Sequence, residues 1–95
     1  MKTVTAADVR AFLFDRYAER LSAAGLNRDR MPEDFDLLTG GIIDSFGILE
    51  MIGAMEDHFG REIDFETIDP SHLTVIGPLS RFVEGQLAAR TSTEG

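Results

Sequence analysis

Residues 44–60, DSFGILEMIGAMEDHFG, decide the fold because they hold the clearest helical period in the chain. Apolar side chains recur there at steps of three and four residues, the spacing of one buried helix face. The predicted buried stripe comprises Ile48, Leu49, Ile52, Met55 and Phe59. Asp44 or Ser45 suits the N-cap, and Gly60 suits the left-handed position that ends a helix. The stretch therefore predicts an amphipathic helix that begins at or beside Ser45.

The place of Ser45 gives its hydroxyl a particular chemical setting. The first turn of a helix presents N–H groups without intrahelical acceptors, together with the positive end of the helix dipole. A phosphate ester on Ser45 would lie in this favourable field, offset in part by the carboxylate of Asp44. Serine before a helix is most often only a cap, so its position alone favours capping over modification.

An amphipathic helix is predicted near the N-terminus. Thr5 as N-cap and Asp8 three residues later form a capping-box pattern, so this helix should begin near Ala6. Gly25 supplies the stop. The predicted apolar face comprises Val9, Phe12, Leu13, Tyr17, Leu21 and Ala24.

The C-terminal part predicts one short helix and one long helix. Asp69 followed by Pro70 is typical of an N-cap with proline at the first helical position, so a single turn is expected from Pro70 to Leu73. A last helix carries Gly77 and Pro78 in its first turn, where a missing N–H costs little. Its predicted stripe comprises Ile76, Leu79, Phe82, Val83 and Leu87.

Residues 26–43 show no period and predict a long loop between the first two main helices. Phe35, Leu37 and Ile42 should be partly buried to hold this loop in place. The sequence thus predicts an all-α fold, a small four-helix bundle of three main helices and one short helix. We expect a single domain over residues 1–95, with a core of about residues 5–88 and a frayed tail at residues 89–95.

Composition narrows the possible functions. The 95 residues suffice for one modest core, with roughly 60–65% of the unfolded surface buried. A net charge of −8 opposes binding to nucleic acid or to anionic membranes and favours partners with basic patches. The chain has no cysteine, so any thioester chemistry needs a borrowed thiol. Without a long apolar run or a signal-peptide pattern, a cytoplasmic monomer is expected.

Acidic residues gather in the part of the chain that contains Ser45. Between Asp29 and Asp69 there are twelve acidic residues against two arginines, Arg30 and Arg61. An acidic stretch is usually only a solvated face, but its location around Ser45 favours a role in docking.

The motif Asp44-Ser45-Phe46, followed by Glu50 to Ile63, resembles the acyl and peptidyl carrier protein family. The similarity runs from about residue 35 to residue 87. In that family the serine of an Asp-Ser-Leu type motif carries 4′-phosphopantetheine, so the resemblance implies this cofactor on Ser45, with Asp44 as the flanking motif residue. Phe46 departs from the commoner leucine, which bears on partner choice and leaves the attachment chemistry unchanged.

The resemblance also implies partners and a docking surface. The expected partners are a phosphopantetheinyl transferase, an acyl- or aminoacyl-activating ligase or acyltransferase, and downstream synthase enzymes with basic docking patches. The helix that starts at Ser45 would be the docking surface. Besides Asp44, the residues expected to contact partners are Phe46, Glu50, Met51, Glu56 and Asp57.

Three functions remain open from the sequence. A free-standing acidic chain favours a discrete acyl carrier that holds acyl intermediates as thioesters. The motif Asp-Ser-Phe-Gly also resembles that of stand-alone aminoacyl or peptidyl carriers, which are the second possibility. An unmodified acidic helical adaptor is the third, and it would function with Ser45 replaced by alanine. Catalysis by the chain itself is not expected, because Ile43 occupies the position where a nucleophile elbow has glycine. No metal site is expected either, since His58 and His72 match no ligand spacing.

Overall fold

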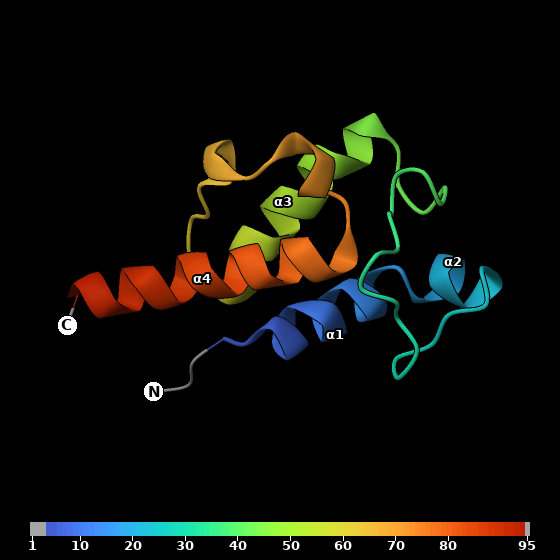
Figure 1. Cartoon of the computed structure of the whole chain (residues 1–95), viewed down its shortest axis with the longest axis horizontal. Coiled ribbons are helices and arrows are strands. Elements are labelled where there is room, and N and C mark those ends of the chain that lie inside the picture. The colour runs from blue at the N-terminus through green and yellow to red at the C-terminus, as the bar shows by residue number, and fades with distance from the viewer. Residues whose placement is uncertain (1–3, 95) are drawn as a thin grey trace.

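Helices make up the regular structure of the chain. The computed structural model describes residues 4–94, with only the backbone described for residues 88–94. The α-helices are α1 (Ala6–Arg16), α2 (Ala18–Ala23), α3 (Ser45–Phe59) and α4 (Ile76–Glu94), and the 3₁₀ turns are η1 (Phe65–Thr67) and η2 (Pro70–His72) (Figure 1). Extended pairing within residues 4–94 is limited to two isolated β-bridges. The predicted all-α class is therefore confirmed for the described residues.

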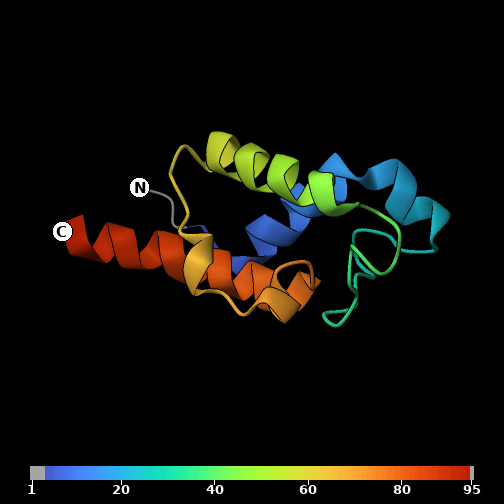
Figure 2. The ribbon, with the colours of Figure 1, turned by 90° about the horizontal axis from the view of Figure 1, so that it is seen from above.

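The first predicted helix is divided in two. Thr5 and Asp8 form the expected capping box, with the Asp8 N–H donating to the Thr5 hydroxyl at 3.2 Å. The helix then breaks at Tyr17, where φ is −115° and ψ is 28°, and the chain changes direction before α2 (Figure 2). A continuous helix to residue 24 was therefore the wrong prediction. After the break, Leu21 is fully buried while Arg20 donates to the carbonyl oxygen of Ile42 at 2.8 Å.

Helices α1 and α4 pack antiparallel to each other and form the centre of the core (Figure 1). Val9 and Leu13 of α1 are fully buried, as are Leu79 and Val83 of α4. The predicted stripe of α4 is confirmed, with Phe82 half-buried and the other four members buried. The backbone of α4 is helical to Glu94, and the side chains of the predicted frayed tail lie outside the described residues.

Helix α3 approaches α1 through long side chains. The ring of Phe12 on α1 lies 4.7 Å from the ring of His58 and 5.8 Å from the ring of Phe59. Met51 and Met55 are fully buried. The helix ends at Gly60, as predicted, with φ 69°. The arrangement leaves the opposite face of α3 in solvent (Figure 2).

The predicted stripe of α3 was only partly correct. Met55 is buried, whereas Ile48, Ile52 and Phe59 are half-buried. Leu49 is 70% exposed, contrary to the prediction, because it lies on the edge of the stripe that faces away from α1. Within the described residues, no helix is long and apolar enough to cross a bilayer.

Candidate functional site at the start of helix α3

Asp44, and not Ser45, caps helix α3. The Gly47 N–H donates to the Asp44 Oδ1 at 2.7 Å, and the Asp44 backbone is extended, as an N-cap requires. Ser45 is the first residue inside the helix and is exposed. The capping role that its position suggested therefore belongs to its neighbour. The Ser45 hydroxyl is at the surface on a helix whose starting point is already fixed.

The backbone that leads into Ser45 is held by a tight turn. Leu37 is fully buried, and its carbonyl oxygen accepts from the N–H groups of Ile42 at 2.9 Å and Ile43 at 3.1 Å. Gly41 turns the chain with φ 78°, a conformation that favours glycine. Phe35 is half-buried and Ile42 buried, so the loop residues predicted to anchor this segment do so.

A second set of contacts ties the same loop to the beginning of α4. Asp36 Oδ1 accepts from the Thr74 hydroxyl at 2.6 Å and from the Leu38 N–H at 2.9 Å. Burial raises the pKa of Asp36, but these hydrogen bonds, with a further one from the Thr39 N–H, outweigh it and hold the pKa below its usual value. The ionised carboxylate therefore fastens the loop that precedes Ser45.

Replacing Asp36 with asparagine is expected to destabilise the fold by about 1 kcal/mol at pH 7. Because the folded-state pKa of Asp36 is depressed, its stabilisation is complete above the ordinary value of 3.8 and is lost as the pH falls through the folded-state pKa. Urea unfolding at pH 7 and at pH 3 should show the gap between wild type and Asp36→Asn shrinking in acid. Asp34→Asn, an exposed acid in the same loop, serves as the control. An equal gap at both pH values would contradict the assignment.

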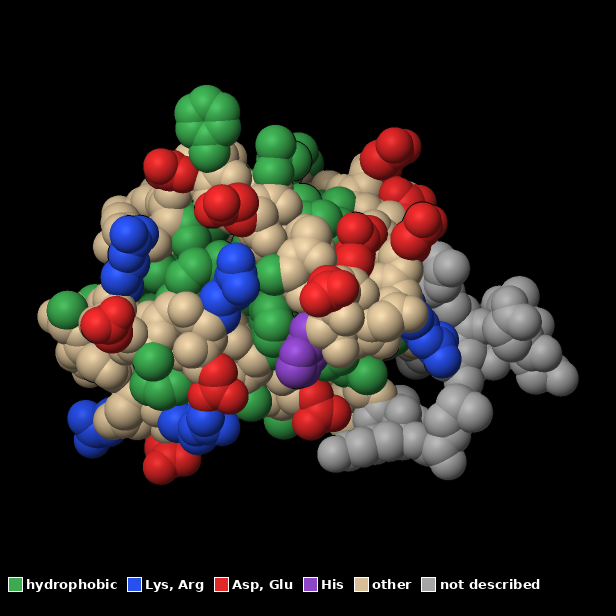
Figure 3. Space-filling view, turned by 180° about the vertical axis from the view of Figure 1, so that it is seen from behind, with side chains coloured by type: hydrophobic (Ala, Val, Ile, Leu, Met, Phe, Trp, Pro, Cys, Tyr) green, Lys and Arg blue, Asp and Glu red, His purple; other side chains and the backbone are tan. Residues whose placement is uncertain are grey.

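The surface around Ser45 combines apolar and acidic side chains. Phe46 is 81% exposed and Leu49 70% exposed, and the acids Asp44 and Glu50 are exposed beside them. Hydrophobic side chains project next to acidic ones along one edge of the face in Figure 3.

Models of protein families, curated proteins and solved structures give no match to this chain. The site is therefore described from its own geometry.

Some of the residues predicted to contact partners are exposed in the structure, and others are buried or half-buried. Phe46, Glu50 and Asp57 are on the surface. Met51 is fully buried, so its predicted contact with partners is corrected to a role in the core. Glu56 is half-buried, and its Oε2 accepts from the Ile63 N–H at 2.9 Å, which fixes the chain after α3. Leu49, which the sequence assigned to the core, joins the exposed surface instead.

Neither histidine lies in the first turn of α3 with Ser45. His58 is in the last turn of the same helix, thirteen residues along and about 20 Å away at ~1.5 Å per residue, so it cannot bond to the Ser45 hydroxyl. His72 lies in η2. Among the described residues, no three side chains of the His, Asp and Glu types are grouped so that they could hold a metal ion.

Proposed function

We propose that this chain is a carrier protein in which Ser45 bears 4′-phosphopantetheine. The observation that carries the proposal is that Asp44 caps α3, which leaves the Ser45 hydroxyl exposed and without a capping role. The resemblance of the surrounding sequence to acyl and peptidyl carriers supports it, and the all-α class of the described residues is compatible with the small four-helix bundle and long first loop that we propose for the domain. The chain catalyses nothing itself and acts as a cytoplasmic monomer.

The residues at the start of α3 fit a phosphodiester on Ser45. The side chain of Asp44 takes up the Gly47 N–H, and helix geometry leaves the N–H groups of Ser45 and Phe46 without intrahelical acceptors at the positive end of the dipole. Exposure of Ser45 gives a transferase access to the hydroxyl. When bound, the group would supply the thiol that this cysteine-free chain lacks, and with it a thioester to cargo.

Attachment would use coenzyme A as donor and a phosphopantetheinyl transferase as catalyst. The Ser45 oxygen forms a bond to the phosphorus that carries pantetheine, and the pyrophosphate bond of coenzyme A breaks. Adenosine 3′,5′-bisphosphate leaves, and the hydroxyl proton passes to the transferase. The part of this chain is to present the hydroxyl from a rigid helix start, because the turn at Leu37 fixes the backbone ahead of it.

The exposed surface beside Ser45 is the proposed docking surface. Phe46 and Leu49 offer apolar contact, and Asp44, Glu50 and Asp57 offer negative charge to basic patches on transferases, ligases and synthases. Such electrostatic complementarity speeds encounter more than it tightens binding, which suits a shuttle that must release each partner. An acyl group is the proposed cargo, and an aminoacyl or peptidyl group is the alternative.

Intact mass spectrometry tests the proposal. After incubation with a promiscuous phosphopantetheinyl transferase and coenzyme A, the wild type is expected to gain one phosphopantetheine and Ser45→Ala none. Ser22→Ala, which replaces an exposed serine in α2, should be modified as the wild type is. No addition to wild-type protein whose circular dichroism shows a folded helical chain would overturn the carrier proposal and favour the unmodified adaptor.

A further inference from the structure

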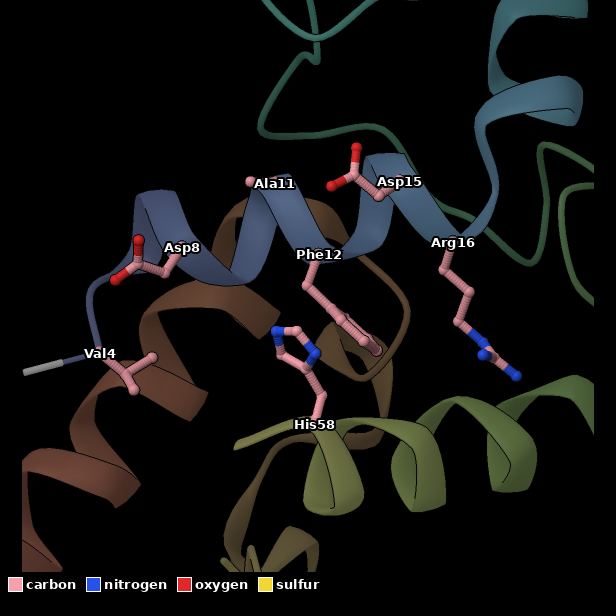
Figure 4. A pocket seen from close by; sticks show the side chains of 7 residues that line it. All are labelled: Val4, Asp8, Ala11, Phe12, Asp15, Arg16 and His58. Atoms are coloured by element: carbon pink, nitrogen blue, oxygen red, sulfur yellow. The ribbon is translucent and has the colours of Figure 1, made fainter. Parts of the chain in front are cut away.

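A groove of about 590 Å³ lies between α1 and α3, and the residue of α3 that lines it is His58, in the last turn of that helix. Two rings from different helices meet in it, Phe12 of α1 and His58 of α3, with centroids 4.7 Å apart and planes at 39° (Figure 4). Val4 and Ala11 add aliphatic surface to its wall. Cavities of roughly 300–1,000 Å³ accommodate small organic ligands, so the groove has the right size and an aromatic surface.

Arg16 brings positive charge into this groove. Its side chain extends from α1 toward α3, one helical turn along α1 from Phe12 (Figure 4). Its guanidinium lies 5.8 Å from the ring centroid of Tyr17 and forms no ion pair with another described residue. A guanidinium presents several N–H donors in a planar fork that matches a carboxylate. The Arg16 donors are therefore available to an anionic group in the groove.

The acidic residues that line the groove are already engaged elsewhere. Asp8 closes the capping box, with its Oδ2 accepting from the Thr5 N–H at 3.0 Å. Asp15 forms an ion pair with Arg28. The Asp15 carboxylate lies on the side of α1 away from His58 and Asp8 lies near Val4 at the start of α1, whereas Phe12 and Arg16 are directed toward α3 (Figure 4). The face turned toward α3 is thus aromatic and cationic, even though the protein as a whole is acidic.

We infer that this groove binds a small flat carboxylic acid. The apolar body of the ligand packs on Phe12 and His58, which gains the hydrophobic and stacking energy of aromatic contact. Its carboxylate pairs with the Arg16 guanidinium through charge-assisted hydrogen bonds, which are about twice as strong as neutral ones. The inference does not depend on modification of Ser45, because Ser45 does not line the groove.

Titration of the ¹⁵N- and ¹³C-labelled full chain with 2-naphthoate, followed by NMR, tests this inference. Saturable shifts are expected at Phe12, Arg16 and His58. The affinity for the neutral amide, 2-naphthamide, should be lower by a factor of about ten or more, since the amide loses the charge-assisted contact. Inorganic phosphate alone should produce no saturable shift at the two rings, because it has no apolar body.

Matched variants separate the contribution of Arg16 from general charge effects. Arg16→Gln is expected to weaken 2-naphthoate binding about tenfold, and Arg16→Lys to restore part of the loss. Arg30→Gln removes the same charge from an exposed loop position and should leave binding unchanged. His58→Phe keeps the ring and should retain binding. Equal affinity for the acid and the amide, equal loss in the Arg30 variant, or no saturable shift in folded protein would each overturn the inference.

Discussion

Met51→Ala is expected to lower the free energy of unfolding by about 2–5 kcal/mol, whereas Leu49→Ala, two residues earlier in α3, should change it by less than about 0.5 kcal/mol. Met51 is fully buried, so truncation removes packed atoms and leaves a cavity. Leu49 is 70% exposed and loses little on truncation. Alanine favours the helix at both positions, which makes the comparison one of packing.

Urea unfolding followed by circular dichroism at 222 nm measures both variants against the wild type. The slope of the free energy against urea should stay constant across the three proteins, so that the midpoints report stability directly. A loss of stability in Leu49→Ala comparable to that in Met51→Ala would mean that the opposite edge of α3 packs on the core. It would also remove Leu49 from the proposed docking surface.

The contrast between Met51 and Leu49 shows where a helical period stops being informative. Residues 46–55 are rich in apolar side chains, so several adjacent stripes satisfy the same spacing. Which stripe is buried depends on where α1 lies, and the contact of Phe12 with His58 and Phe59 fixes that placement. Those contacts join residues far apart in the chain. The period therefore predicted the helix correctly and its buried edge only in part.

Local chemistry explains what was predicted correctly. The capping box of Thr5, the end of α3 at Gly60 and the N-cap of η2 at Asp69 depend on residues within a few positions of one another. The break at Tyr17 has no comparable signal, because no proline or glycine lies near it. It accompanies the burial of Leu21 and the contact of Arg20 with the Ile42 carbonyl, both of which are tertiary.

The candidate site follows the same division. The sequence placed Ser45 at a helix start but left the cap open between Ser45 and Asp44, since either side chain can accept the bond. In the structure the Gly47 N–H donates to the Asp44 carboxylate, so Asp44 is the cap. The clasp between Asp36 and Thr74 joins residues 38 positions apart and could not be found from spacing. The same is true of Glu56, whose side chain bonds to Ile63 and is thereby drawn away from the surface role predicted for it.

Gly77→Ala and Gly85→Ala, both in α4, are expected to change stability in opposite directions. A Cβ at residue 77 would lie 2.7 Å from the Cβ and 3.0 Å from the carbonyl oxygen of Glu33. The loop would have to move, although the Gly77 N–H bonds to that oxygen at 2.8 Å and the Ile76 N–H to the Phe35 oxygen at 3.0 Å. Such overpacking costs about 1–3 kcal/mol.

At residue 85 a new Cβ meets nothing within 4 Å, so alanine should stabilise the helix by about 0.5–1 kcal/mol. Thermal unfolding shows whether each substitution raises or lowers the stability. Amide hydrogen exchange at Leu37 and Ile42 locates the effect of Gly77→Ala. Because these residues hold the turn that leads to Ser45, their protection should fall in Gly77→Ala and stay unchanged in Gly85→Ala. Unchanged protection in both variants would mean that the turn before Ser45 is held independently of the contact between Gly77 and Glu33, by contacts such as that of Arg20 with Ile42 and that of Asp36 with Thr74.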